Sequence, residues 1–192
     1  DENGIVIDDY QRTSNKRIFA AGDVANQLKF THSAYAYAEY ATLNALLPFR
    51  FFKSSSRVIP WTTYVDPEVA HVGLPYSELV EREDAFTCYR SSFHENDRAK
   101  VEGSSAGFVK LYAKKGKSRL VAATVVSVNA GDLISELSLA ITSGKGLAEI
   151  GKTVHPYPTR AESIRKAADA YTFSKLTPSL KKLVETWIRA MR

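Results

Sequence analysis

The chain has 192 residues, 44% of them hydrophobic and 24% charged, and its formal net charge is +5 at pH 7. This composition is typical of a soluble globular protein with one or two hydrophobic cores. No apolar run approaches the roughly 20 residues of a bilayer-spanning helix, and no signal peptide opens the chain. Because the first residue is Asp and not Met, we expect the sequence to be part of a longer protein.

The cysteine and aromatic content argues against a disulfide-stabilised protein and against a nucleic-acid-binding protein. Cys88 is the only cysteine, which rules out an internal disulfide and indicates a reducing, cytoplasmic setting. It lies in a strand-like segment, and we interpret it as a small core residue. The ten Tyr and nine Phe residues are scattered through apolar periodic segments. That pattern favours core packing over base stacking, and we expect no nucleic-acid partner.

The first part of the chain is expected to form one domain, residues 1–52. Short strands are expected at 5–7 and 18–21, followed by a helix from Thr31 to about Leu47. Alanines recur at helical spacing in this helix, which indicates close packing on a sheet. The polar, Ser-rich residues 53–56 are interpreted as a linker.

Residues 57–176 have the pattern of an α+β domain, an antiparallel sheet with helices packed on it. The expected strands are 62–65, 69–72, 85–91, 108–113 and 120–127, the last two forming a hairpin across 114–117. The expected helices are 75–83, 97–101, 129–144 and 160–171. Asp66-Pro67-Glu68 is interpreted as a turn between two strands.

A last helix, residues 177–192, begins with the favourable cap Thr177-Pro178. One face of this helix is apolar and basic residues lie elsewhere; the apolar residues are Leu180, Leu183, Val184, Trp187, Ile188 and Met191, and the basic ones are Lys181, Lys182 and Arg189. Such a helix can lie on a membrane surface. Packing against its own domain or a partner subunit is the more common use, and it is the interpretation that we favour.

The segment 17–23 is a short apolar strand that leads directly into Gly22-Asp23. Gly22 lacks a Cβ, so a ligand can lie against the backbone, and Asp23 can accept hydrogen bonds from sugar-like hydroxyls. Thr31-His32 begins a helix whose N-terminus offers N–H groups to negative charge. The alternative interpretations, which involve no ligand, are an ordinary strand-end turn and a capped surface helix.

Near the C-terminus, the segment 155–159 reads His-Pro-Tyr-Pro-Thr and is followed by Glu162. Thr159 and Glu162 have the spacing of a capping box, which would give Glu162 a structural role. The tyrosine, Tyr157, has an ordinary pKa near 10, so it can donate a proton but is a poor base. His94 has no partner at metal-ligand spacing, and we expect no metal site.

In this order, Thr13, Gly22-Asp23, Thr31-His32, Asp66-Pro67-Glu68 and the segment 155–159 resemble the C-terminal portion of the FAD-dependent pyridine nucleotide–disulfide oxidoreductases. That family includes dihydrolipoamide dehydrogenase, glutathione reductase and mercuric reductase. The resemblance covers nearly the whole chain. It implies that residues 1–52 are a remnant of an FAD-binding α/β domain and that residues 57–176 are the interface (dimerisation) domain. It also implies a homodimer that uses FAD, with NAD(P)H as co-substrate and a small molecule, a disulfide or a metal ion as electron acceptor.

The same resemblance implies which residues contact FAD. Asp23 would hold the ribityl hydroxyls, and the helix N-terminus at Thr31 would point at the pyrimidine end of the isoalloxazine. The cofactor-binding residues that follow are Gly22, Asp23, Thr31, His32 and Ala34.

The catalytic residues implied by the resemblance are Tyr157, Glu162 and His155, acting in the partner subunit's site. Dihydrolipoamide dehydrogenase-like members have His-x-His-Pro-Thr-x-x-Glu here, with the second His as acid/base and the Glu orienting it. His155, Pro158-Thr159 and Glu162 match this pattern, but Tyr157 replaces the second His. Tyrosine here is associated with the mercuric reductase-like branch. The last residues lack the cysteine pair of that branch, so mercury reduction by that route is not expected.

The sequence contains no Gly-x-Gly-x-x-Gly and no Cys-x4-Cys redox pair. We therefore expect the isolated chain to be inert as a reductase and to bind FAD weakly or not at all. Two alternatives remain open. The chain could be a non-catalytic homodimerisation module, or a membrane-associated adaptor that acts through its terminal helix.

Overall fold

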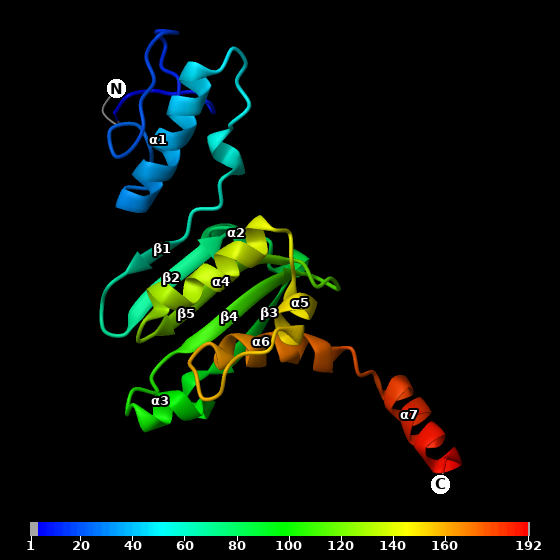
Figure 1. Ribbon diagram of the computed structural model, residues 1–192. Helices are drawn as coiled ribbons and strands as arrows, with labels where there is room; N and C mark the ends of the chain where they lie inside the picture. The colour runs from blue at the N-terminus through cyan, green and yellow to red at the C-terminus, as the bar shows by residue number, and fades with distance from the viewer. Residues whose placement is uncertain (1–3, 192) are drawn as a thin grey trace. The chain divides into compact units, whose positions relative to one another are not determined.

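The computed structural model describes residues 4–191, apart from the side chain of Lys181. The chain divides into two compact units, Asp1–Ile59 and Pro60–Arg192 (Figure 1). Each unit is described by itself.

The first unit is built around one helix, α1, Thr31–Leu46. The strands expected at 5–7 and 18–21 are not formed in the described part of this unit, so that expectation was wrong. The only ladder contact there is an isolated bridge between Arg12 and Phe19. A strand needs a neighbour along its length to satisfy its backbone groups. Among the described residues, Ile5 makes one backbone hydrogen bond, to the Val24 carbonyl at 2.7 Å, and Ile18 remains 52% exposed.

Side-chain hydrogen bonds take the place of a sheet in holding the first unit together. Asn44 of α1 is buried, donates to the Phe52 carbonyl at 2.8 Å and accepts from the Phe52 amide at 3.2 Å. The short 3₁₀ helix η1, Ser54–Ser56, is bound by Asp9, which accepts hydrogen bonds from the hydroxyls of Ser54 and Ser55. The segment interpreted as a linker is therefore hydrogen-bonded to the first unit.

The second unit contains a five-stranded sheet in which every neighbouring pair is antiparallel. The strands are β1 Trp61–Thr63, β2 Glu68–Gly73, β3 Phe86–Ser92, β4 Phe108–Lys114 and β5 Leu120–Ser127, in the order β1-β2-β5-β4-β3. The expected α+β class and the expected β4–β5 hairpin are confirmed.

Two of the longer helices, α4 and α6, cover one face of this sheet (Figure 1). The helices of the unit are α2 Tyr76–Glu81, α3 Asp97–Val101, α4 Ala130–Thr142, α5 Leu147–Lys152, α6 Glu162–Ser174 and α7 Pro178–Ala190. Short 3₁₀ turns lie at Glu83–Ala85 and Phe93–Glu95. α5 was not expected, because its six residues present only Leu147 and Ile150 to the core.

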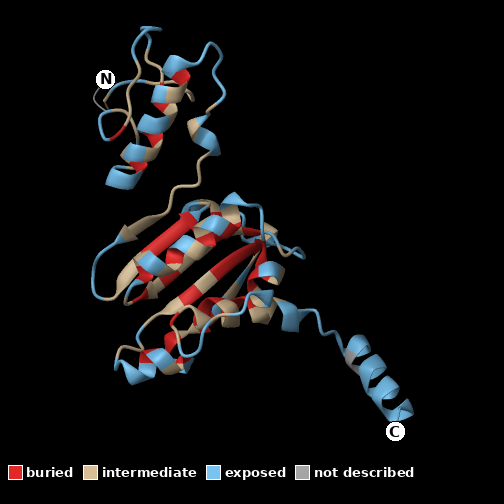
Figure 2. Cartoon of the chain, in the orientation of Figure 1, coloured by how far each residue is buried: buried red, intermediate tan, exposed pale blue. Residues whose placement is uncertain are grey.

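The core lies between the sheet and these helices, where buried residues form the red band of Figure 2. Val109, Leu111 and Val125 alternate along β4 and β5 and are fully buried, as period-2 patterning requires. Leu137 of α4 and Ile164 of α6 fill the facing layer and are also fully buried. The buried residues of the strands and those of the helices therefore form one apolar layer.

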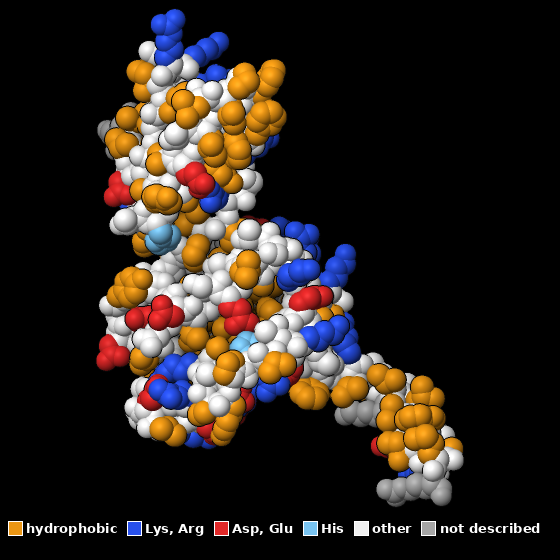
Figure 3. All heavy atoms as spheres, viewed as in Figure 1, with side chains coloured by type: hydrophobic (Ala, Val, Ile, Leu, Met, Phe, Trp, Pro, Cys, Tyr) orange, Lys and Arg blue, Asp and Glu red, His pale blue; other side chains and the backbone are white. Residues whose placement is uncertain are grey.

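The terminal helix α7 begins as expected, with the Thr177 hydroxyl accepting from the Leu180 amide at 3.3 Å. Its apolar face is not covered by the described residues of the chain. Hydrophobic side chains run along it in Figure 3, and all six that were expected to pack are between 40% and 65% exposed: Leu180, Leu183, Val184, Trp187, Ile188 and Met191. Packing against its own domain, one of the two interpretations favoured from the sequence, is not observed, and packing against a partner subunit stays a prediction.

His71 on β2 is a buried polar residue of the opposite sheet face. Its Nδ1 lies 2.9 Å from Thr124 Oγ1, its Nε2 lies 2.9 Å from the Leu74 carbonyl, and its ring lies against Trp61. Burial lowers the pKa of His71 below its ordinary value. The folded chain therefore holds this imidazole neutral.

We predict that His71 makes the chain less stable in mild acid. Its folded pKa lies below its unfolded pKa, so the unfolded chain takes up the proton first as the pH falls, and stability is lost below about pH 6.5. Urea unfolding near neutrality and in mild acid should show a smaller acid loss in His71→Gln than in the wild type. His94→Gln, at an exposed histidine, is the control. An equal acid loss in wild type and His71→Gln would contradict this reading.

Candidate functional site

The segment His155–Thr159 joins α5 to α6, and Arg160 anchors its end. The Arg160 side chain is 7% exposed. Its Nε donates to Glu102 Oε2 at 2.8 Å, its Nη1 to the Ser127 hydroxyl at 3.0 Å, and its Nη2 to Ser104. A buried guanidinium needs such partners, since an unpaired buried charge is strongly unfavourable. The segment is therefore fixed from the inside of the fold.

A second anchor comes from Asn96, which is fully buried at the N-cap of α3. Its Nδ2 donates to the Thr159 carbonyl at 3.0 Å and to the Ser163 hydroxyl at 3.0 Å, while its Oδ1 accepts from the Ala99 amide. One side chain thus caps α3 and holds the segment beside it. This places the first turn of α3 next to Tyr157.

Tyr157 is bound at its hydroxyl but otherwise open to solvent. Its ring is 70% exposed, and its Oη donates to Asp97 Oδ2 at 3.1 Å. The hydrogen bond to Asp97, helped by the negative charge of that carboxylate, raises the pKa of Tyr157. The same hydrogen bond lowers the pKa of Asp97. The pair therefore keeps the proton on the phenol and the charge on the carboxylate.

His155 points to a different partner, Glu136 of α4. The imidazole is 5% exposed, with Nε2 at 3.0 Å from Glu136 Oε1 and Nδ1 at 3.0 Å from the Thr153 carbonyl. Together with Leu139 and Ile150 it lines an apolar hollow of about 430 Å³. Both ring nitrogens of His155 therefore lie within hydrogen-bond distance of oxygen atoms of the same chain.

Glu162 does not form the expected capping box, and that interpretation was wrong. The N-cap of α6 is Ala161, and the Thr159 hydroxyl donates to the Pro156 carbonyl at 2.7 Å instead. Glu162 Oε1 lies 3.8 Å from the cations of Arg165 and Lys166. Its other oxygen is buried and accepts no hydrogen bond from the described residues. Tyr157, His155 and Glu162 are therefore each held by different partners, and the hydroxyl of Tyr157 is bound by Asp97.

In the first unit, Gly22 packs against the first turn of α1. Its φ is +85°, which favours glycine, and an added Cβ would lie 3.3 Å from the Cβ of Ala34. Asp23, Thr31 and His32 are exposed around this contact. The first turn of α1 contains no acidic side chain, so nothing in that turn neutralises its positive end. An exposed carboxylate and a helix N-terminus without acidic residues have the chemistry to bind the edge of a flavin cofactor.

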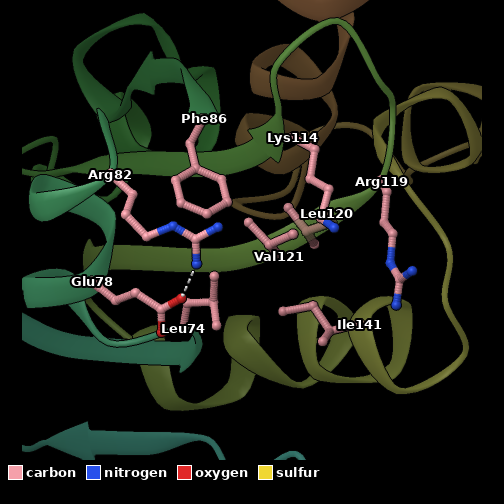
Figure 4. Close-up of a pocket in the computed structure, with 9 residues that line it drawn as sticks. All are labelled: Leu74, Glu78, Arg82, Phe86, Lys114, Arg119, Leu120, Val121 and Ile141. Carbon is pink, nitrogen blue, oxygen red and sulfur yellow. Dashed lines mark hydrogen bonds and ion pairs between the residues drawn. The ribbon is translucent and has the colours of Figure 1, made fainter. Parts of the chain in front are cut away.

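A further hollow, of about 330 Å³, lies among α2, β5 and α4 (Figure 4). Arg82 donates to Glu78 at 2.9 Å, and its guanidinium lies over the ring of Phe86. The remaining lining residues are Leu74, Lys114, Arg119, Leu120, Val121 and Ile141. None of the residues predicted for catalysis or FAD binding lines this hollow, and it plays no part in the site.

Cys88 is exposed on the sheet face away from α4 and α6, so its interpretation as a core residue was wrong. Cys88 lies opposite Tyr112 of β4, and desolvation of its thiol by neighbouring groups raises the pKa of the thiol. Within residues 4–191, no group of three or more His, Cys, Asp or Glu side chains is placed to hold a metal ion.

The comparisons with known proteins identify the family. Residues 59–168 match the family described as pyridine nucleotide-disulphide oxidoreductase, dimerisation domain, and residues 1–38 match the one described as pyridine nucleotide-disulphide oxidoreductase. The chain belongs to the pyridine nucleotide-disulphide oxidoreductase family. This family is FAD-dependent and uses NAD(P)H as co-substrate, and the resemblance drawn from the motifs is confirmed.

Relatives show which part of the family fold is present. The chain is 36% identical to mercuric reductase of Streptomyces lividans over 173 residues, and 34% identical to dihydrolipoyl dehydrogenase 2 of Haloarcula marismortui over 171 residues. These matches cover 88% of this chain but only 35% and 36% of the relatives. The chain thus spans little more than a third of their length.

Solved structures agree on the fold. LpdA from Mycobacterium tuberculosis superposes with a TM-score of 0.79 at 26% identity, over 88% of this chain and 36% of that chain. The HOCl-induced flavoprotein disulfide reductase RclA from Escherichia coli gives 0.75 at 18% identity, over 87% of this chain and 38% of that chain, which shows the shared fold alone.

Sequence reasoning missed Asp97, Asn96, Arg160 and Glu136. The Asn96-Asp97 pair carried a usable signal, because Asn directly before a predicted helix is a favoured N-cap. The contact between Asp97 and Tyr157 joins residues that are 60 positions apart, and no local pattern reports it.

We predict that Asp97→Asn lowers the pKa of Tyr157 toward its ordinary value. The substitution keeps a hydrogen-bond acceptor but removes the negative charge that disfavours the phenolate. The titration can be followed in the full chain by NMR of the Tyr157 ring. Asp84→Asn, at an exposed carboxylate distant in sequence, should leave the titration unchanged. An unchanged pKa in Asp97→Asn would show that the pair does not form in solution.

Proposed function

We propose that this chain is the dimerisation part and the flavin-proximal edge of a homodimeric, FAD-dependent NAD(P)H oxidoreductase. The observation that carries the proposal is the exposed Tyr157 ring, presented on an internally anchored segment where the family has its acid/base residue. An anchored but open side chain is suited to reach a site on another subunit. We place the enzyme in the cytoplasm, with a small molecule, a disulfide or a metal ion as electron acceptor.

Five residues of the first unit are proposed to contact FAD: Gly22, Asp23, Thr31, His32 and Ala34. Bound FAD would carry electrons from NAD(P)H to the acceptor. Asp23 would accept hydrogen bonds from the ribityl hydroxyls, and the N-terminal turn of α1 would stabilise negative charge on the pyrimidine side. Gly22, packed on Ala34, brings the Gly22-Asp23 backbone close to the first turn of α1.

Tyr157 is proposed to act as a hydrogen-bond and proton donor in the partner subunit's site. Its raised pKa keeps the phenol protonated at neutral pH, so it donates and does not act as a base. Its single O–H donates to Asp97 in this structure, so this hydrogen bond must be exchanged for one to the acceptor before the proton is donated. His155 and Glu162 are retained as secondary candidates: His155 is held by Glu136, and Glu162 has one buried carboxylate oxygen that accepts no hydrogen bond from the described residues.

The alternative is a homodimerisation module without chemistry. The isolated chain is proposed to be inert as a reductase and to bind FAD weakly or not at all. A longer parent that carries a Gly-rich nucleotide loop and a cysteine pair would favour the enzyme. A parent without them would favour the module.

In the longer enzyme, Tyr157→Phe should slow turnover with the electron acceptor on the order of 10²-fold, while flavin reduction by NAD(P)H changes little. The phenol is needed where the acceptor receives its proton, and nicotinamide oxidation does not use it. Stopped-flow measurement of the two half-reactions separates these effects. Tyr64→Phe, at a tyrosine that is 80% exposed, is the matched control. Equal slowing of both half-reactions would refute the assignment.

A further inference from the structure

The apolar face of α7 is a feature that the proposed function leaves unexplained. Its residues recur at spacings of three and four over Leu180–Met191, so they lie on one side of the helix. All are exposed, and Trp187, near the middle of the face, is 61% exposed. A continuous exposed apolar surface of this kind marks a site of interaction.

The charges of α7 indicate what covers this face. Lys182 and Arg189 lie outside the apolar face, and Glu185 is the one acidic residue of the helix. A second copy of α7 would bring like charges together. A surface of anionic headgroups complements them, and each nearby basic residue strengthens binding to such a surface.

The length of α7 fits a helix that lies on a bilayer. Its 13 residues span about 20 Å, less than the roughly 30 Å of a hydrocarbon core. None of the helices in residues 4–191 has the length and apolarity of a membrane-crossing segment. Tryptophan is enriched at the membrane–water interface, where its ring is buried and its N–H stays hydrated.

We propose that α7 docks the protein onto an anionic lipid surface, with its apolar face in the headgroup region and its basic residues against the phosphates. Lipid docking takes the place of packing against the chain's own domain, which the structure does not show. Packing against a partner subunit is the competing outcome of the test. The proposal is independent of Tyr157 and of FAD. It adds a lipid surface to the partners of this chain.

Flotation of the full chain with phosphatidylcholine vesicles containing roughly 25 mol% phosphatidylglycerol tests the proposal. We expect binding to these vesicles, little binding to pure phosphatidylcholine, and a blue shift of tryptophan emission that Trp187→Phe abolishes. Val184→Asp should abolish binding. Val80→Asp, at an exposed helical valine of similar exposure (50% against 42%), should not.

Charge is tested separately by Lys182→Glu/Arg189→Glu, which should weaken binding to anionic vesicles at least about tenfold. Lys115→Glu/Lys117→Glu, in the exposed β4–β5 turn, should leave it unchanged. Three results would overturn the proposal: equal binding of wild type and Val184→Asp, equal binding to neutral and anionic vesicles, or no vesicle binding together with a smaller particle for Val184→Asp in light scattering. The last would mean that a second copy covers α7.

Discussion

The guanidinium of Arg160 constrains the rest of the candidate site. A cation removed from water must be paired, and Arg160 finds its partners at the end of α3, at Ser104 and at the end of β5. Those partners fix the residues on either side of it. Together with Asn96, they anchor the chain at Thr159 and Arg160, just after Tyr157. A rigid support for an exposed side chain is what a site shared between subunits requires.

The support also changes the chemistry of Tyr157. Because Asn96 caps α3 and holds Thr159, the carboxylate of Asp97 is placed at the phenol. In the family pattern a glutamate on the following helix orients the acid/base residue. Here Glu162 interacts with Arg165 and Lys166 and does not bind the phenol. The chain thus combines the family fold with a tyrosine whose hydrogen-bond partner comes from another element.

Local patterns predicted much of the fold. The β4–β5 hairpin, the start of α7 and the bounds of α3 depend on residues within one or two turns of each other, and these were correct. The strands at 5–7 and 18–21 failed because a strand depends on a neighbour that local sequence does not specify. Tyr157 was singled out as a candidate because it replaces the second His of the family pattern His-x-His-Pro-Thr-x-x-Glu. Asp97 and Arg160 were missed because their partners lie 60 and 58 positions away.

The Tyr157 ring and the apolar side chains of Leu139 and Val154 are exposed and are available for contact with a second copy of the chain. Sedimentation equilibrium of the 192-residue chain at micromolar concentration measures this directly. We expect twice the mass of the 21.3 kDa chain. A monomer mass throughout the concentration range would contradict the proposal that this chain is the dimerisation part of a homodimeric enzyme.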